Sequence, residues 1–320
     1  MCGRAWYTDG MKNTFIVLLL AVILGGGIFW YTKKDVPVSE KEVVRNEEEM
    51  IVPNTPTKNQ AAQTASSTQL DKTKTVLGTS VGGNSITAYH YGEGEKEVLF
   101  IGGIHGGYEW NTVLLAYQLM DHLKANPAVI PKNVRVTIIP VLNPDGLAKV
   151  VGTSTGRFSL KDVSPAEATV ISGRFNGNDV DLSRNFDCDW KSTGTWQTKS
   201  VSGGSQVFSE PESKAIKSYV EKKAPSAVVV WYSAAGGVFA SSCHNGVSGE
   251  TSLITKKFAD ASGYPAYDSF DYYATTGDIV NWFAKSNIPA VSVLLTNHTD
   301  TEWTKNRAGF DALVKYYSTK

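Results

Sequence analysis

The chain has 320 residues, of which 42% are hydrophobic and 19% are charged, a composition typical of one large globular domain with appendages or of two small domains. Lys and Arg together number 31, as do Asp and Glu, so the formal net charge is zero. The chain therefore lacks the excess of basic residues that is typical of nucleic-acid-binding proteins, and small-molecule or peptide ligands are favoured.

The first 75 residues differ in composition from the rest of the chain. After a short segment at residues 1–13, residues 14–31 form an uncharged apolar run that is long enough to span a bilayer as a helix. The run ends in GIFWYTKK and lacks the small residues of a signal-peptide cleavage site, which favours a retained membrane anchor. Residues 35–75 are polar and predict a disordered linker. We therefore expect an extracytoplasmic domain that is anchored in a membrane, or secreted if the apolar segment is cleaved.

From residue 76 to residue 320, β-branched runs alternate with helical patterns, which predicts βαβ units. Strands that are apolar on both faces are predicted at residues 97–105, 134–143, 227–234 and 290–297. Helices are predicted at residues 111–126, 210–223, 251–261, 277–285 and 302–317. The predicted fold is a single α/β domain with a mixed, mostly parallel central sheet flanked by helices. In such sheets the ligand site lies beyond the carboxyl ends of the strands.

The first candidate site follows the strand predicted at residues 97–105. His105 lies at the end of this strand, and Glu109 lies at the start of the next predicted helix, with Gly106 and Gly107 between them. Imidazole and carboxylate groups that converge from a strand-turn-helix junction suit a Zn²⁺ ion, and the two glycines let the backbone turn. The alternative is a histidine that ends a strand and a glutamate that the helix N-terminus favours.

Further motifs follow along the chain, and together they carry a resemblance to a known family. They are GGIHGGYEWNT at residues 102–112, NPDG at 143–146, RFNGNDVDLSRNF at 174–186, FSEPE at 208–212 and YYATTGDIVNW at 272–282. The region from residue 76 to residue 320 resembles the M14 zinc carboxypeptidases, a family that includes bacterial peptidases acting on cell-wall peptides. The resemblance implies a zinc-carboxypeptidase-like fold, one Zn²⁺ ion, and a peptide substrate with a free C-terminal carboxylate.

The resemblance also implies roles at the centre of the site. His105 and Glu109 match the first two zinc ligands of the family, although the family usually separates them by two residues and not by three. A turn at the two glycines can restore the geometry. Arg174 matches the guanidinium that stabilises the oxyanion, a task that suits an arginine on electrostatic grounds.

Other matching positions concern the substrate. Arg184 matches the arginine that binds the terminal carboxylate, and Ser183 stands where the family usually has Asn. Tyr273 lies nine residues before Trp282, which matches the mobile tyrosine that closes over the substrate. Asp278 lies in the segment that shapes the specificity pocket, so we expect it to bind an amine or to cap a helix.

Two further positions depart from the family pattern. The third zinc ligand should be a His, but Tyr232 occupies this position, and a phenol with a pKa near 10 is a poor ligand unless the metal lowers that pKa. His244 and His298 are the possible substitutes. The general base should be a Glu, but Leu294 occupies its position, which leaves Glu302 as a candidate base or as a residue that favours a helix N-terminus.

The sequence therefore leaves three functions open. The first is a zinc metallocarboxypeptidase in which His105, Glu109 and Tyr232 hold the metal and Glu302 is the base. The second is a non-catalytic module that binds peptides, and the third is an acylase-type amidohydrolase. We also expect a monomer and predict a disulfide between Cys188 and Cys243, for which two independent buried thiols are the alternative.

Overall fold

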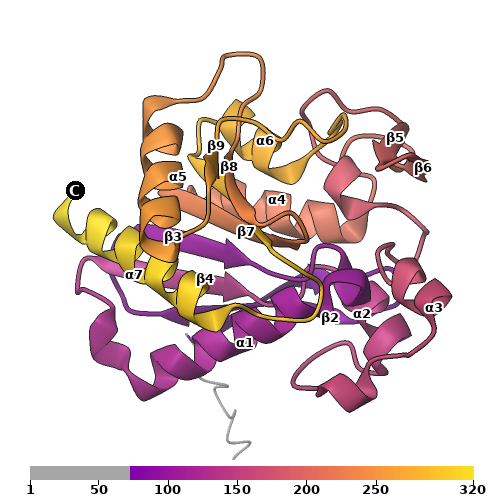
Figure 1. Ribbon diagram of the computed structural model, residues 1–320, viewed down its shortest axis with the longest axis horizontal. Helices are drawn as coiled ribbons and strands as arrows, with labels where there is room; N and C mark the ends of the chain where they lie inside the picture. Colours follow the sequence, from indigo (N-terminus) through magenta and orange to yellow (C-terminus); the bar gives the residue numbers. More distant parts are fainter. Residues whose placement is uncertain (1–72) are drawn as a thin grey trace, which may run out of the picture. The chain divides into compact units, whose positions relative to one another are not determined.

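The computed structural model describes residues 73–320, and its centre is one eight-stranded sheet (Figure 1). The strand order is β1-β2-β4-β3-β7-β10-β8-β9. The strands span Lys74–Thr79 (β1), Ser85–Tyr91 (β2), Lys96–Ile101 (β3), Val134–Ile139 (β4), Ala227–Ser233 (β7), Gly237–Ala240 (β8), Ala266–Tyr267 (β9) and Ala290–Leu295 (β10). The pairings β4-β3, β3-β7, β7-β10 and β8-β9 are parallel, and the others are antiparallel. The predicted mixed, mostly parallel sheet is thus confirmed.

The four predicted strands are β3, β4, β7 and β10, which lie together in the middle of the sheet. Every residue of β7 and β10 is buried, as expected for strands that carry helices on both faces. Successive side chains of β3 alternate between the two faces, so that Phe100 enters one hydrophobic core while Leu99 and Ile101 enter the other.

Two layers of helices cover the sheet. The helices are Trp110–Ala125 (α1), Pro144–Val151 (α2), Glu167–Ser172 (α3), Pro211–Lys223 (α4), Gly249–Ser262 (α5), Ile279–Lys285 (α6) and Trp303–Thr319 (α7). Helices α1, α5 and α7 pack in the core that contains Phe100, whereas α4 and α6 pack in the opposite core (Figure 1). The described residues therefore form a single three-layer α/β domain.

Several elements were not predicted from the sequence. They are the outer strands β1, β2, β8 and β9, the short helices α2 and α3, and a separate two-stranded sheet of Thr193–Trp196 (β5) and Lys199–Ser202 (β6). Strand β1 begins at Lys74, two residues before the expected start of the domain. The predicted N-terminal segment, the anchor at residues 14–31 and all but the last residues of the linker lie outside the described residues. No helix within residues 73–320 combines the length and apolar character needed to cross a bilayer.

Candidate functional site

A cavity of about 620 Å³ lies beyond the carboxyl ends of β3, β7 and β10, as the sequence predicted for a sheet of this kind. Its lining includes nearly all the residues that the sequence singled out, namely His105, Glu109, Arg174, Ser183, Arg184, Tyr232, Tyr273 and Asp278. Glu302 is absent from this lining. The motifs are far apart in sequence, but the sheet brings them to one place.

The turn Gly106–Glu109 (η1) brings His105 and Glu109 into contact despite the extra residue between them. Oε1 of Glu109 lies 2.9 Å from Nδ1 of His105, and both side chains are buried. Gly106 has a φ of 47°, and a Cβ there would lie 2.6 Å from the carbonyl oxygen of Gly173. Only glycine therefore permits this turn. The second carboxylate oxygen of Glu109, Oε2, is buried without a hydrogen-bond partner.

Asp181 is a member of the site that sequence reasoning missed. Its carboxylate lies 3.4 Å from Nε2 of His105 and accepts hydrogen bonds from Nε of Arg174 at 2.9 Å and from the hydroxyl of Ser183 at 2.8 Å. Burial alone would raise the pKa of Asp181, but the Arg174 guanidinium and the bond from His105 hold it well below its usual range. The sequence feature that could have identified Asp181 is its position within the DVDLSRNF motif, two and three residues before Ser183 and Arg184.

Arg174 is almost completely buried between charged and aromatic neighbours. Its guanidinium pairs with Asp181 at 2.8 Å and lies 3.1 Å from Nδ1 of His105. The ring of Trp196, at the end of β5, covers the guanidinium at 4.5 Å, and Tyr108 lies on it at 5.7 Å. This packing fixes the arginine at the cavity wall, where cation–π attraction adds to the ion pair.

Arg184 occupies the adjacent part of the cavity. Its Nη1 donates to the carbonyl and to the hydroxyl oxygen of Ser183, at 2.9 and 3.0 Å, while Nε and Nη2 both donate to the carbonyl of Thr195. The ring of Tyr273 lies 5.8 Å from the guanidinium. The β5-β6 hairpin therefore holds Arg184 through Thr195 and Arg174 through Trp196, a contribution that the sequence did not predict.

Asp278 lies in the same cavity and caps helix α6. One of its oxygens accepts hydrogen bonds from the backbone of Val280 at 2.9 Å and of Asn281 at 3.2 Å. Burial raises the pKa of Asp278, and the Arg184 guanidinium offsets part of this increase. The Asp278 carboxylate caps the helix and also lines the cavity. Capping a helix and binding an amine, the two roles expected from the sequence, are therefore compatible.

The third position expected for a zinc ligand holds a buried tyrosine. The ring of Tyr232 lies 5.3 Å from that of His105, and its hydroxyl is buried without a partner. Burial raises the pKa of Tyr232 well above its ordinary value, so the phenol stays neutral. A zinc site of this type needs three protein ligands, and only His105 and Glu109 are suitable. The residues present therefore do not fit the metal that the family implies.

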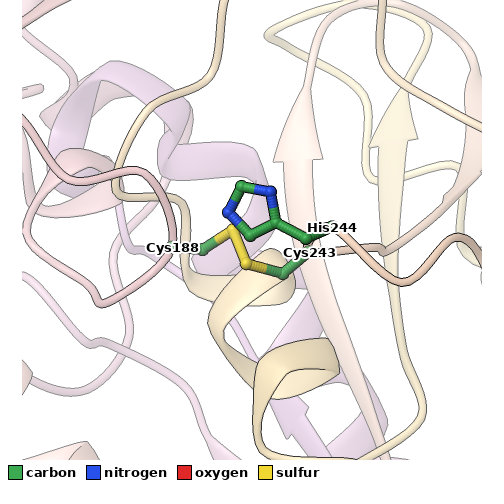
Figure 2. Close-up of side chains that lie close together, drawn as sticks. All are labelled: Cys188, Cys243 and His244. Atoms are coloured by element: carbon green, nitrogen blue, oxygen red, sulfur yellow. A yellow bond between two sulfur atoms is a disulfide. The ribbon is translucent and has the colours of Figure 1, made fainter.

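Neither histidine considered as a substitute completes such a set in this structure. His298 lines the cavity and its Nδ1 lies 3.0 Å from the hydroxyl of Ser233, but the ligand atoms of His298, His105 and Glu109 do not all lie within 4.8 Å of one another. His244 is exposed and pairs with Asp189 at 3.0 Å. Within residues 73–320, His244, Cys188 and Cys243 form the only group of three potential metal ligands whose ligand atoms all lie within 4.8 Å of one another (Figure 2).

The sulfur atoms of Cys188 and Cys243 form a disulfide, which confirms the predicted pairing (Figure 2). Their Cα atoms are 6.1 Å apart. Sulfur atoms joined in a disulfide are not available as thiolate ligands. The backbone carbonyl of Cys188 also accepts from the N–H of Gly277 at 2.7 Å, next to Asp278. The disulfide thus braces the cavity wall and is not part of a metal site.

The structure does not bring Glu302 to the cavity. Its carboxylate accepts hydrogen bonds from the backbone N–H of Thr296 at 2.6 Å, from the Thr296 hydroxyl at 2.8 Å and from Tyr264 at 2.7 Å, and pairs with Lys305 at 2.8 Å. Burial would raise the pKa of Glu302, but these partners lower it. Leu294, at the expected base position, does line the cavity. Glu302 thus stabilises the turn between β10 and α7, and no sequence signal revealed these partners.

Comparisons with known proteins agree with this architecture. A family model described as zinc carboxypeptidase, peptidase M14, matches residues 59–296. Human carboxypeptidase Z is 32% identical over 98 residues, which are 29% of this chain and only 14% of the human protein. The murein-tripeptide amidase of Escherichia coli O157 has the same fold with a TM-score of 0.52 at 19% identity, over 76% of this chain and 91% of the other.

The carboxypeptidase A of Helicoverpa armigera likewise has the same fold, with a TM-score of 0.58 at 17% identity. The likeness covers 77% of this chain and 67% of the insect protein. At these identities the solved structures show a shared fold, while the family model covers most of the chain. The chain therefore belongs to the zinc carboxypeptidase family, peptidase M14.

Proposed function

We propose that the domain binds peptides through their free C-terminal carboxylate and does not hydrolyse them. One observation carries the proposal: two buried arginines, Arg174 and Arg184, line a cavity together with Tyr232 and Leu294. The resemblance to the family implies that these last two residues replace the third zinc ligand and the general base. A neutral phenol and an alkyl side chain cannot perform those tasks. On this proposal, the groups that recognise a peptide end are retained and those that cleave it are lost.

The carboxylate-binding role rests on the geometry of Arg184. A guanidinium has five N–H groups, and the bonds to Ser183 and Thr195 use four of them, which leaves one Nη2 N–H for a ligand. Two more N–H groups, one on Nε and one on Nη2, become available if a ligand oxygen replaces the carbonyl of Thr195. Tyr273 covers the guanidinium and would exclude water from the bound carboxylate, which strengthens the ion pair.

Asp278 supports a preference for ligands that carry an amine. It is a buried carboxylate in the same cavity as Arg184, so a C-terminal residue with a basic side chain could pair with both. Wall-stem peptides and the ends of extracellular proteins both offer such residues. We propose that the protein meets them as a monomer on the outer side of a membrane, where the apolar run at residues 14–31 anchors it.

Hydrolysis by a zinc-dependent carboxypeptidase is the second candidate. It is favoured by the unpartnered Oε2 of Glu109 beside His105 and by His298 in the same cavity. Both functions predict binding of a peptide with a free C-terminus. They differ in whether the peptide is cleaved when Zn²⁺ is supplied.

The test is calorimetric titration of the full chain with N-acetyl-alanyl-lysine, followed by mass spectrometry of the mixture after incubation with Zn²⁺. The C-terminal amide of the same peptide is the control ligand. We expect saturable binding of the free acid, much weaker binding of the amide, and no release of lysine. Equal binding of acid and amide would contradict carboxylate recognition, and zinc-dependent release of lysine would establish the peptidase.

A further inference from the structure

Three buried polar atoms of residues that line the cavity have no hydrogen-bond partner. They are Oε2 of Glu109, Nη2 of Arg174 and the hydroxyl of Tyr232. Their side chains are 2%, 1% and 7% exposed, so water does not satisfy them freely. Buried polar groups are normally paired, and each exception requires an explanation. The ion pair of Arg174 Nη2 with Asp181 is short but does not satisfy hydrogen-bond geometry.

The three unpartnered groups surround one residue, His105. Oε1 of Glu109 lies 2.9 Å and Nη1 of Arg174 lies 3.1 Å from its Nδ1, so the unpartnered Oε2 and Nη2 belong to side chains that contact this imidazole. The ring of Tyr232 lies 5.3 Å from the imidazole ring. The tyrosine hydroxyl and the guanidinium N–H are donors, and the carboxylate oxygen is an acceptor. A ligand that satisfies all three must offer an acceptor with two lone pairs and a donor close to it. A peptide group has both.

We infer that Tyr232, Arg174 and Glu109 form a binding site for the last peptide group of the ligand. Its carbonyl oxygen accepts from Tyr232 and Arg174, and its N–H donates to Oε2 of Glu109. The inference rests on the proposed function, because the carboxylate held at Arg184 places the last peptide group next to His105. Tyr232 is then a specificity residue that distinguishes a peptide from a simple carboxylic acid.

The N–H contact is tested with wild-type protein. Titration compares N-acetyl-alanyl-lysine with its ester analogue, in which an oxygen replaces the N–H of the last peptide group. We expect the ester to bind about three- to tenfold more weakly, the loss typical of one hydrogen bond. Equal affinities would overturn the contact with Glu109, even if Tyr232 could not be altered without unfolding.

The carbonyl contact is tested with Tyr232→Phe, which removes only the unpartnered hydroxyl. We expect about three- to tenfold weaker binding of the peptide and unchanged binding of 6-aminohexanoate, which has a carboxylate and an amine but no peptide group. The matched control is Tyr219→Phe, because the Tyr219 hydroxyl is buried outside the cavity and donates to Glu97. This control should bind both ligands as the wild type does.

Each outcome separates the inference from the proposed function. If Tyr232→Phe binds the peptide as tightly as the wild type, the inference fails and carboxylate recognition stands. If wild-type protein binds no peptide, both fail. Zinc that the wild type retains and Tyr232→Phe loses would show that the phenol is a metal ligand, which would also overturn the inference.

Discussion

The hydroxyl of Ser183 lies 2.9 Å from Nε2 of His105, although the two residues are 78 positions apart in sequence. The same hydroxyl donates to Asp181 and accepts from Arg184. It therefore connects the histidine that precedes the turn Gly106–Glu109 with the arginine proposed to bind the ligand. Because these contacts occupy the Ser183 hydroxyl, we expect Ser183 to affect ligand binding by orienting Arg184 and not by contacting the ligand itself.

Replacing Ser183 with alanine should weaken ligand binding by about three- to tenfold, since Arg184 loses one hydrogen bond that orients it. Calorimetric titration of N-acetyl-alanyl-lysine measures the effect. Ser248→Ala is the control, because Ser248 caps helix α5 and should cost about 1 kcal/mol of stability without changing affinity. Wild-type affinity in Ser183→Ala would show that Arg184 needs no such support.

Arg184→Lys should weaken binding of the peptide by about tenfold or more, because an ammonium group cannot reproduce the fork that contacts both Ser183 and Thr195. The positive charge is kept, so the loss reports geometry. Arg157→Lys is the control, since Arg157 is exposed and pairs with Asp121 on the surface. A similar decrease in both variants would argue against a specific carboxylate site.

Removing the disulfide by Cys188→Ser with Cys243→Ser should lower the free energy of unfolding by about 2–4 kcal/mol, because the bond closes a loop of 55 residues. Thermal unfolding with and without reductant measures the effect. Reductant should lower the melting temperature of the wild type and leave that of the double variant unchanged. Two free thiols in unreduced protein would contradict the pairing.

Acidification should remove the stabilising contribution of Glu302. The pKa of this carboxyl is lowered in the folded protein from an ordinary value of 4.5, so its contribution is present above pH 4.5 and is lost as the pH falls below that value. We expect Glu302→Gln to be less stable than the wild type by about 1–2 kcal/mol at pH 7, with the difference shrinking toward pH 3. Denaturant unfolding measures it, and a difference that is constant with pH would contradict the assignment.

Glu95→Gln is the control for this measurement, because Glu95 is exposed. Its stability should follow that of the wild type at every pH. If the stability of Glu302→Gln falls with pH in parallel with that of the wild type, other carboxylates cause the loss of stability in acid. Asp181 is then the best candidate, because its pKa is also lowered.

Tyr232→Phe should stabilise the ligand-free protein, because a buried hydroxyl without a partner costs about 1–3 kcal/mol. Tyr219→Phe should destabilise it, since Glu97 would lose the hydroxyl that donates to it. Thermal unfolding of the two variants therefore gives shifts of opposite sign. A lower melting temperature for Tyr232→Phe would indicate that the hydroxyl has a partner.

The central sheet could be predicted because its strands follow a simple rule. Strands β7 and β10 are apolar on both faces, and only burial between two helical layers explains such runs. The hairpin of β5 and β6 could not be predicted, because its sequence is polar and its stability depends on Trp196 stacking on Arg174, a contact between distant segments. The outer strands were missed because they are short or partly exposed.

The candidate site was predicted through several motifs taken together. Arg174 and Arg184 were found through the resemblance of residues 174–186 to the family, and the cavity contains both. Glu302 was considered as a base because Leu294 lacks a carboxylate. Its actual partners, Thr296, Tyr264 and Lys305, depend on the left-handed turn that begins α7, with a φ of 45° at Glu302, and no local pattern reveals such a turn.

Zinc binding in the cavity separates the two candidate functions, and the zinc content of the full chain after exposure to Zn²⁺ and dialysis measures it most directly. His105→Ala is the negative control, and Tyr232→His, which supplies an imidazole as the third ligand beside His105 and Glu109, is the positive control. We predict that the wild type retains no more zinc than His105→Ala, whereas Tyr232→His retains close to one ion per chain. Near-stoichiometric zinc in the wild type that His105→Ala loses would contradict the account and restore the peptidase as the leading function.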